Sequence, residues 1–240
     1  MSVKTRLVDY DDGQTNYQGM FAVDDSFTGE RPGVLIAHTI RGRTAFEEGK
    51  AEALARLGYA AFALDVYGKA ELDTGDDNKR GHMTALIADR AELAQRLLLS
   101  LRVMRAQQEV DAERIAAIGF CFGGLCVLDI ARSGEQLAGV VSFHGLLIPP
   151  ETGEVRPIKA RVLVLHGWDD PLALPESVVA LGAEMSAAGA DWQLHAYGNT
   201  MHAFTNPAAN DTTRGTVYDA AADRRSWVAM KDFLDELFGA

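Results

Sequence analysis

Residues 114–128, RIAAIGFCFGGLCVL, contain the stretch that decides the fold. Residues 115–119 are small and apolar and follow charged positions, as in a strand that is buried on both faces of a sheet. Residues 125–131 then have the apolar content of a helix packed on that sheet. The short segment 119–124 between them leaves no room for a loop. The sequence therefore predicts a strand that turns directly into a helix at Cys121.

A turn this sharp forces its central residue into strained backbone geometry, and glycines on either side keep the two elements from colliding. Gly119 and Gly123 stand two residues before and two residues after Cys121. The pattern is a G-x-S-x-G nucleophile elbow with cysteine in the place of serine. In such an elbow the next backbone N–H, here that of Phe122, is half of an oxyanion hole. The alternative is that Cys121 is a buried small hydrophobic residue and that the glycines serve packing alone.

The whole chain has the length and composition of one large α/β domain, residues 1–240. It has 23 Lys and Arg against 34 Asp and Glu, a formal net charge of −11, so nucleic acid is not an expected partner. Cys121 and Cys126 are too close on one short helix for a disulfide and match no metal-ligand spacing. No apolar run resembles a signal peptide or a membrane span. We therefore expect a cytoplasmic protein with reduced thiols, no metal and no membrane contact.

Periodicity and turn residues predict the order of the elements. Besides the strand of the elbow, strands are expected at residues 5–8, 17–23, 33–38, 59–64, 137–143, 161–166 and 192–197. Helices are expected at 46–57, 83–107, 125–131, 176–188 and 221–238, and loops at 69–81 and 146–159. The first two strands form an antiparallel pair, and strands then alternate with helices. This order predicts a mostly parallel central sheet with helices on both faces.

Ligands bind beyond the carboxyl ends of the strands of such a sheet. Asp170 and His202 each lie just past a predicted strand end, and the order nucleophile, acid, histidine is that of the α/β-hydrolases. His202 would take the proton of the Cys121 thiol, and Asp170 would fix the tautomer of the imidazole. The second oxyanion donor would be the backbone N–H of Ile40, which follows the strand at 33–38.

These assignments have alternatives. Asp170 stands before Pro171 and would serve equally as a turn residue, and Asp169 is its immediate rival. His202 is preferred because it combines the required chain order with a loop that we expect to be exposed. Other histidines at strand ends would be structural, and these are His38, His144 and His166.

With these residues in place, the chain resembles the dienelactone hydrolase family of α/β-hydrolases over nearly its full length. The matching pieces are VLIAHTIRG, GYAAFALDVYG, IGFCFGG, HGWDDPLALP and MHAFTNP. The resemblance implies the α/β-hydrolase fold, a small-molecule ester or lactone substrate, and no cofactor. Carried over by motif, it implies a nucleophile, an acid, a base and two oxyanion donors, which are Cys121, Asp170, His202, Ile40 and Phe122.

Two departures from the founding members of that family stand out: one affects how the thiol is ionised, and the other affects how the carboxylate of a dienelactone substrate would be bound. They resemble this chain but have a glutamate where it has Thr39 and an arginine where it has Asn206; Arg80 lies near the expected place of their second arginine. Thr39 and Arg80 are also candidates to line the site. The further candidates are Arg41, Tyr67, Trp168 and Phe204. For each of these four, the alternative is an ordinary packing contact or a solvated position on the surface.

Two other classes of function stay open at this level. The first is a non-catalytic or redox-sensing protein of the same fold that uses Cys121 as an oxidisable thiol. The second is a serine-type thioesterase or peptidase, against which stands the lack of an elbow around Ser100, Ser133, Ser142 and Ser177. The sequence leaves the acyl group, the leaving group and the oligomeric state open.

Overall fold

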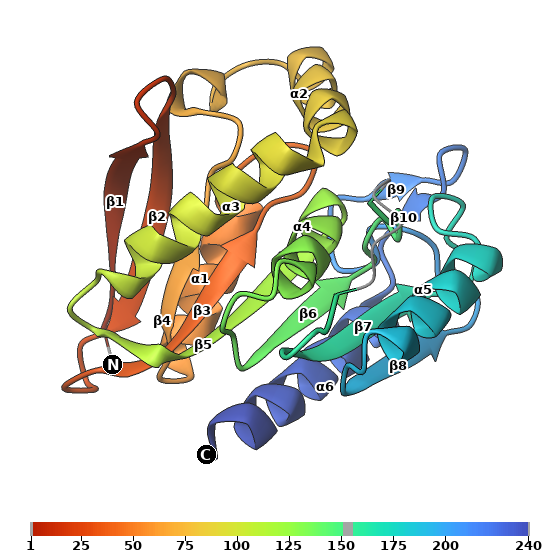
Figure 1. The fold of residues 1–240 in the computed structure, drawn as a ribbon. Helices are drawn as coiled ribbons and strands as arrows, with labels where there is room; N and C mark the ends of the chain where they lie inside the picture. Colours follow the sequence, from red (N-terminus) through yellow and green to blue (C-terminus); the bar gives the residue numbers. More distant parts are fainter. Residues whose placement is uncertain (1, 151–155, 240) are drawn as a thin grey trace. The chain divides into compact units, whose positions relative to one another are not determined.

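The computed structural model describes residues 2–150 and 156–239. The chain divides into two compact units, Met1–Ala117 and Ile118–Ala240. Each unit is built from strands and helices in alternation, and the elements are labelled in Figure 1. The division into units does not test whether the whole chain is one domain, so that expectation stays a prediction.

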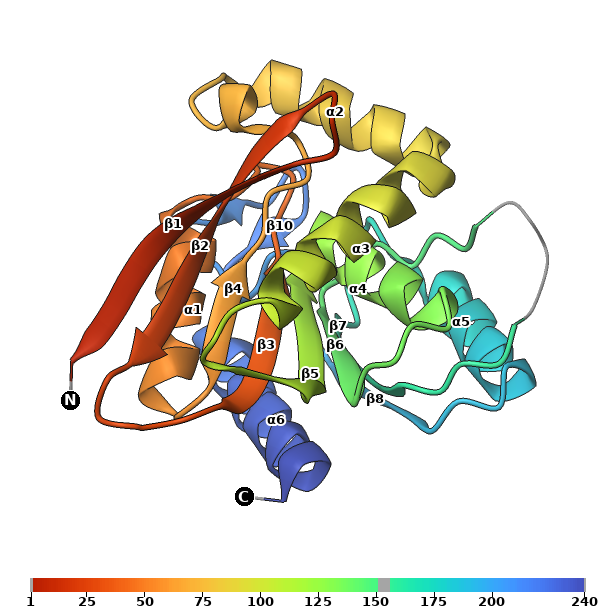
Figure 2. The ribbon, with the colours of Figure 1, turned by 60° about the vertical axis from the view of Figure 1, so that its left-hand side comes forward.

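The first unit begins with an antiparallel strand pair and ends in the strand of the elbow. Its elements are β1 (Val3–Asp11), β2 (Asn16–Asp24), β3 (Arg31–Ala37), α1 (Ala45–Arg56), β4 (Ala60–Ala63), the 3-10 turn η1 (Lys69–Glu71), α2 (Asp76–Ala88), α3 (Arg90–Arg105) and β5 (Val110–Phe120). β2 pairs antiparallel with both β1 and β4, whereas β3 and β4 are parallel. Helix α1 packs on β2, β3 and β4, and α3 packs on β3 from the opposite face (Figure 2).

Local chemistry explains where α1 begins and ends. Thr44 and Glu47 form a capping box, in which each side chain bonds the backbone N–H near the other. The helix ends before Gly58, whose φ of 96° is open to glycine and costly for other residues. The helix expected at 46–57 is thereby confirmed to within a residue at each end.

The segment before the elbow differs from expectation. The loop expected at 69–81 is wrong, because η1 and the start of α2 occupy this segment. The single helix expected at 83–107 is also wrong, because the chain is divided there into α2 and α3 at Asp89. Asp89 leaves the helical region, with φ −115° and ψ 81°, and its carboxylate accepts the N–H of Glu92. An aspartate that caps a new helix in this way replaces the backbone bond that a continuous helix would have made. Helix α2 was missed because it is polar and contains glycine.

The second unit begins with the last residues of β5. It continues with α4 (Phe122–Arg132), β6 (Gly139–Phe143), β7 (Arg161–Gly167), α5 (Pro175–Ala187), β8 (Trp192–Tyr197), β9 (Asn210–Asp211), β10 (Thr216–Val217) and α6 (Ala220–Phe238). β6, β7 and β8 are parallel. Helix α4 packs on β6, and α6 packs on β6 and β7. The sequence did not predict β9 and β10, which are too short to show a period. Part of the loop expected at 146–159 lies outside the described residues.

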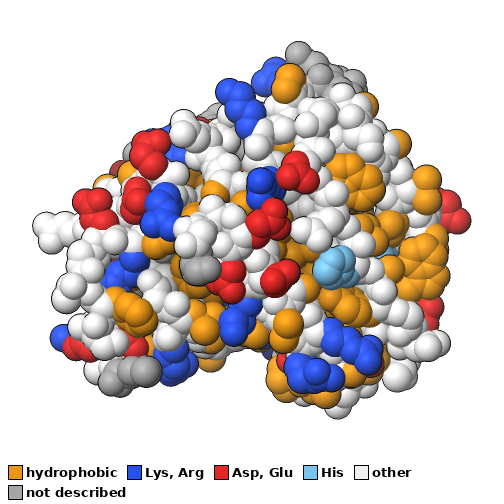
Figure 3. All heavy atoms as spheres, turned by 90° about the horizontal axis from the view of Figure 1, so that it is seen from below, with side chains coloured by type: hydrophobic (Ala, Val, Ile, Leu, Met, Phe, Trp, Pro, Cys, Tyr) orange, Lys and Arg blue, Asp and Glu red, His pale blue; other side chains and the backbone are white. Residues whose placement is uncertain are grey.

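The strand order of the main sheet is β1-β2-β4-β3-β5-β6-β7-β8, and β9 and β10 form a small separate pair. The expected α/β fold with a mostly parallel central sheet is confirmed. Lys and Arg side chains lie among Asp and Glu side chains on the face drawn in Figure 3. Within residues 2–150 and 156–239, no helix is both long and apolar enough to cross a membrane.

Candidate active site

Cys121 lies at a sharp corner between β5 and α4. Its φ of 58° and ψ of −116° place a non-glycine residue in a sparsely populated backbone region. A Cβ at Gly119 would stand 2.0 Å from the carbonyl oxygen of Gly123, so this position has room for glycine alone. The direct turn from strand to helix that the sequence predicted is therefore confirmed, and its steric reason is the contact between the two glycines.

The carboxyl end of β6 supports this corner. The backbone N–H of Cys121 donates to the carbonyl of Phe143 at 3.1 Å, and the N–H of Leu146 donates to the carbonyl of Cys121 at 3.3 Å. Cys121 also occupies the position just before the first turn of α4. Because a helix N-terminus favours negative charge, this position favours the thiolate form of a cysteine.

His202 and Asp170 form a buried pair. Nδ1 of His202 lies 2.7 Å from Oδ2 of Asp170, and both side chains are almost completely buried. The other carboxylate oxygen, Oδ1, accepts the N–H of Leu172 at 2.8 Å. Asp170 thus forms the turn that the alternative assignment required and also contacts the imidazole. Its rival Asp169 is exposed.

The backbone of His202 pairs with β10 and with Gly215, the residue before it. The N–H of His202 donates to the carbonyl of Gly215, and the N–H of Val217 donates to the carbonyl of His202, each at 2.9 Å. The exposed loop expected at His202 is therefore wrong, since this histidine is 2% exposed. The sequence did not predict β10, which pairs with this loop, because β10 has only two residues.

Charge on the neighbouring groups controls His202. Burial alone would lower the pKa of its imidazole, but the charge of Cys121 and the hydrogen bond with Asp170 outweigh burial and raise the pKa to about 10. A side-chain hydrogen bond with Cys121 also contributes to this rise, so the thiol and the imidazole interact directly. The raised pKa favours the imidazolium form of His202, whose Nδ1 is held by Asp170.

The remaining strand-end histidines differ from one another. Nδ1 of His38 lies 2.7 Å from the carbonyl of Thr39, Nε2 accepts the N–H of Val66 at 3.3 Å, and burial lowers its pKa. Burial also lowers the pKa of His166, and neither of its ring nitrogens has a hydrogen-bond partner in the part of the chain that the structure describes. The ring of His144 lies against that of His202. Within the same part of the chain, no group of these side chains is arranged to hold a metal ion.

In the first unit, a buried carboxylate holds the loop that follows β3. Oε1 of Glu47 accepts the N–H of Thr39 at 3.0 Å, and Oε2 accepts the N–H and the hydroxyl of Thr44 at 2.9 and 2.7 Å. Glu47 has no exposed surface. The loop between these threonines contains Ile40, whose N–H is the expected oxyanion donor. Glu47 is not among the site residues predicted from the sequence, although the pattern Thr44-x-x-Glu47 is a capping-box signal.

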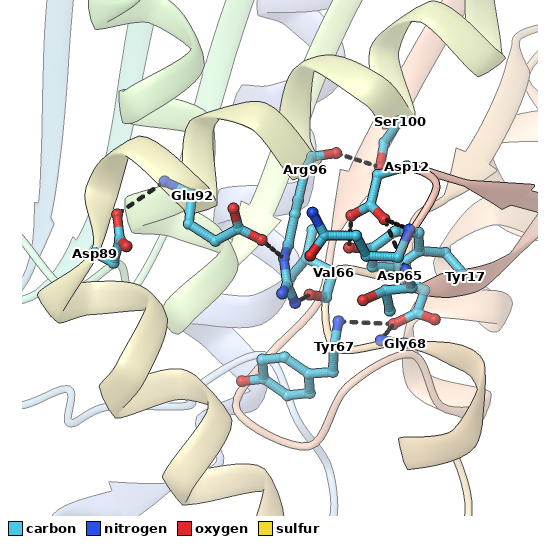
Figure 4. A network of polar contacts seen from close by, with 12 residues as sticks. Asp12, Tyr17, Asp65, Val66, Tyr67, Gly68, Asp89, Glu92, Arg96 and Ser100 are labelled. Carbon is cyan, nitrogen blue, oxygen red and sulfur yellow. Dashed lines mark hydrogen bonds and ion pairs between the residues drawn. The ribbon is translucent and has the colours of Figure 1, made fainter.

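The loop that follows β4 is held in a similar way (Figure 4). Oδ1 of Asp65 accepts the N–H groups of Tyr67 and Gly68 at 2.9 and 3.0 Å. The guanidinium of Arg96 donates to the carbonyl of Val66 at 2.8 Å. Tyr67, an expected lining residue, is thus fixed at its backbone, and its buried ring packs against the ring of His38 at 4.6 Å between centroids.

The other expected lining residues have varied surroundings. Arg41 is exposed and contacts Asp76 at 2.8 Å, and Arg80 is exposed on α2. Trp168 is 43% exposed beside the turn of Asp170. Phe204 has no exposed surface and packs edge-on against the rings of His144 and Tyr197.

Comparison with known proteins shows the family to which the chain belongs. The sequence model of the dienelactone hydrolase family matches residues 18–238. A dienelactone hydrolase-like promiscuous phosphotriesterase from metagenomic libraries is 39% identical, with a TM-score of 0.94 over 99% of this chain and 100% of that one. An uncharacterized protein of Caenorhabditis elegans is 37% identical over 150 residues, which are 61% of this chain and 95% of its own.

A Yersinia pestis protein with the provisional name carboxymethylenebutenolidase is 25% identical over 226 residues, 90% of this chain and 82% of its own. The family match covers the elbow, the Asp170 turn and the His202 loop together. The chain belongs to the dienelactone hydrolase family and is a hydrolase of esters or lactones.

Proposed function

We propose that the protein hydrolyses a small ester or lactone through a thioester on Cys121, with His202 as the base and Asp170 as its partner. The observation that carries the proposal is the strained elbow at Cys121 in a unit where a buried imidazole is held by a carboxylate at 2.7 Å. A cysteine held in such a conformation and an imidazole oriented by a carboxylate are the two parts that nucleophilic catalysis requires.

In the first step the thiolate of Cys121 attacks the carbonyl carbon of the ester, and a C–S bond forms as the carbonyl oxygen takes the negative charge. The backbone N–H of Phe122, at the start of α4, would donate to this oxyanion, and the N–H of Ile40 as a second donor stays a prediction from the family motif. The raised pKa of His202 supports this step, because an imidazolium is the counter-ion of a thiolate.

When the tetrahedral intermediate collapses, the C–O bond to the alcohol breaks and His202 gives its proton to the leaving oxygen. The imidazole, now neutral, takes a proton from a water molecule that attacks the thioester. The second intermediate expels the thiolate of Cys121 and releases the acid. For a lactone, the alcohol and the acid are the two ends of one product. Asp170 holds the ring in one tautomer throughout.

The test is the turnover of a chromogenic short-chain ester together with the intact mass of the protein. We expect wild type to turn over, Cys121→Ala to be inactive, and His202→Ala to accumulate one acyl group per chain on Cys121, because attack is retained while water activation is lost. Cys126→Ala is the control for a buried thiol outside the elbow and should retain an acylatable Cys121. Full activity in Cys121→Ala would remove the proposal.

A phosphotriester is a second candidate substrate, since the 39% identical relative that covers the whole chain is a promiscuous phosphotriesterase. Attack of the same thiolate on phosphorus would displace an alcohol and leave a phosphorylated Cys121. A neutral nitrophenyl phosphotriester in the same assay distinguishes the two, because the adduct masses differ.

The redox-sensing alternative predicts no turnover of either substrate and a Cys121 that peroxide oxidises reversibly. The cytoplasm stays our expectation for the location of the protein.

A further inference from the structure

The residues at the carboxyl end of β6 contact both Cys121 and His202, but none of them is a proposed reacting group. Phe143 and Leu146 bond the backbone of Cys121, as described above. Between them lies His144, whose ring centroid is 5.1 Å from that of His202, with the two planes at 66°. An edge-to-face arrangement of this kind restrains the orientation of both rings.

His144 is held in place at some conformational cost. Its φ is 37°, in the left-handed region that residues other than glycine rarely adopt. Its backbone N–H donates to the carbonyl of Leu165 on β7 at 2.8 Å. Strain of this kind persists where the surroundings fix the residue, and it is concentrated at functional sites.

The side chain of His144 makes a buried hydrogen bond to the loop of the proposed base. Nε2 of His144 lies 2.8 Å from Oγ1 of Thr205, three residues after His202, and both side chains are 1% exposed. The loop contains two further residues with positive φ, Asn199 and Ala203. A loop with this much backbone strain needs external contacts to hold one conformation, and this hydrogen bond is one that comes from β6.

We propose that His144 and Thr205 form a clasp that positions the imidazole of His202 against the sulfur of Cys121. The inference rests on the proposed roles of Cys121 and His202. Through the clasp, the end of β6 fixes the nucleophile by its backbone and the base by a side chain. One rigid strand end thereby sets the geometry between them, and misplacement of a catalytic group by about 1 Å costs up to 10²-fold in rate.

The titratable groups around His202 come from three other segments. They are Cys121 at the elbow, Asp170 and His166 from the end of β7 and its turn, and His144 from the end of β6. A change in the orientation of the His202 imidazole relative to the Cys121 sulfur therefore changes the ionisation of these two groups. A loss of packing elsewhere in the protein leaves that ionisation unchanged.

The decisive variants are Thr205→Val, which removes the hydroxyl at constant shape, and Thr205→Ser, which restores it. Thr200→Val is the matched control, because Thr200 is a buried threonine of the same loop whose hydroxyl bonds the carbonyl of Gly198 instead. The readouts are kcat, KM and the rate of Cys121 alkylation by iodoacetamide from pH 5 to 10. The alkylation rate reports on the thiolate and needs no substrate.

We expect Thr205→Val to lower kcat about tenfold with KM within about twofold, and to displace the pH profile of alkylation. Thr205→Ser should recover both, and Thr200→Val should change neither. His144→Phe keeps a ring against His202 but removes Nε2, so it should reproduce Thr205→Val, and the double variant should add little to either.

The clasp is disproved if Thr205→Val and Thr200→Val behave alike, with lower thermal stability and an unchanged alkylation profile. If Thr205→Val fails to fold, the same comparison is made with His144→Phe. A wild-type enzyme whose turnover does not depend on Cys121 would instead disprove the proposed function, while the alkylation profiles would still decide the clasp.

Discussion

Buried carboxylates hold loops in both units of the molecule, but they are satisfied in different ways. In the first unit, Glu47 and Asp65 accept backbone N–H groups with both oxygens of each carboxylate, and Glu47 also accepts a hydroxyl. In the second unit, Asp170 accepts one backbone N–H and gives its other oxygen to an imidazole. A carboxylate whose two oxygens are both satisfied by backbone N–H groups is structural. One that keeps an oxygen for a titratable side chain is a candidate for chemistry.

The largest effect expected from this difference is on activity at Asp170. Asp170→Asn keeps the size of the side chain but offers the wrong hydrogen-bonding pattern to Nδ1 of His202, so kcat/KM should fall by about 10²–10⁴-fold. The measurement is ester hydrolysis beside the thermal midpoint. Asp169→Asn, the exposed neighbour, should lie within about twofold of wild type. Equal losses in the two variants would contradict the distinction drawn here.

The next effect is on stability at Glu47. Glu47→Gln replaces a carboxylate oxygen by an amide NH₂ that faces backbone N–H groups, so the free energy of unfolding should fall by roughly 1–3 kcal/mol. Urea denaturation measures it. Glu52→Gln on the same helix is the control, because Glu52 makes an exposed ion pair with Arg56, and it should cost less than about 0.5 kcal/mol. A Glu47→Gln protein as stable as wild type would show that the loop does not depend on this carboxylate.

The smallest expected effect is on how stability depends on pH, to which His38 and His202 contribute differently. Burial holds the folded pKa of His38 below 6.5, so the unfolded chain takes up the proton first as the pH falls. Stability contributed by neutral His38 is therefore complete above about pH 6.5 and is lost on acidification through the folded pKa. The raised pKa of His202 acts in the opposite direction, because stability from this group increases as the pH falls through the unfolded pKa near 6.5.

His38→Gln should accordingly flatten the fall in stability between pH 7 and pH 5, measured by urea denaturation at several pH values. His195→Gln, at a part-exposed position on β8, is the matched substitution with which the slope of His38→Gln is compared. If the slopes of wild type and His38→Gln are the same, His38 is not held neutral by burial.

Short-range sterics made much of this protein predictable from its sequence. The elbow at Cys121 follows from the spacing of Gly119 and Gly123, since a strand can turn into a helix in so few residues only where two backbones approach closely. The strand ends that contain Asp170 and His202 follow from apolar runs that stop at polar residues. The family resemblance rests on these same local motifs.

Other features depend on contacts between residues far apart in the chain, and the tertiary structure alone decided them. The backbone pairing of His202 with β10, the division of the long helix at Asp89 and the bond between His144 and Thr205 have no periodic signal in the sequence. The sequence ranked Asp170 above Asp169, but which carboxylate reaches the imidazole depends on how the turn folds. A motif specifies the residues that chemistry needs, whereas their directions and surroundings come from the packing of distant segments.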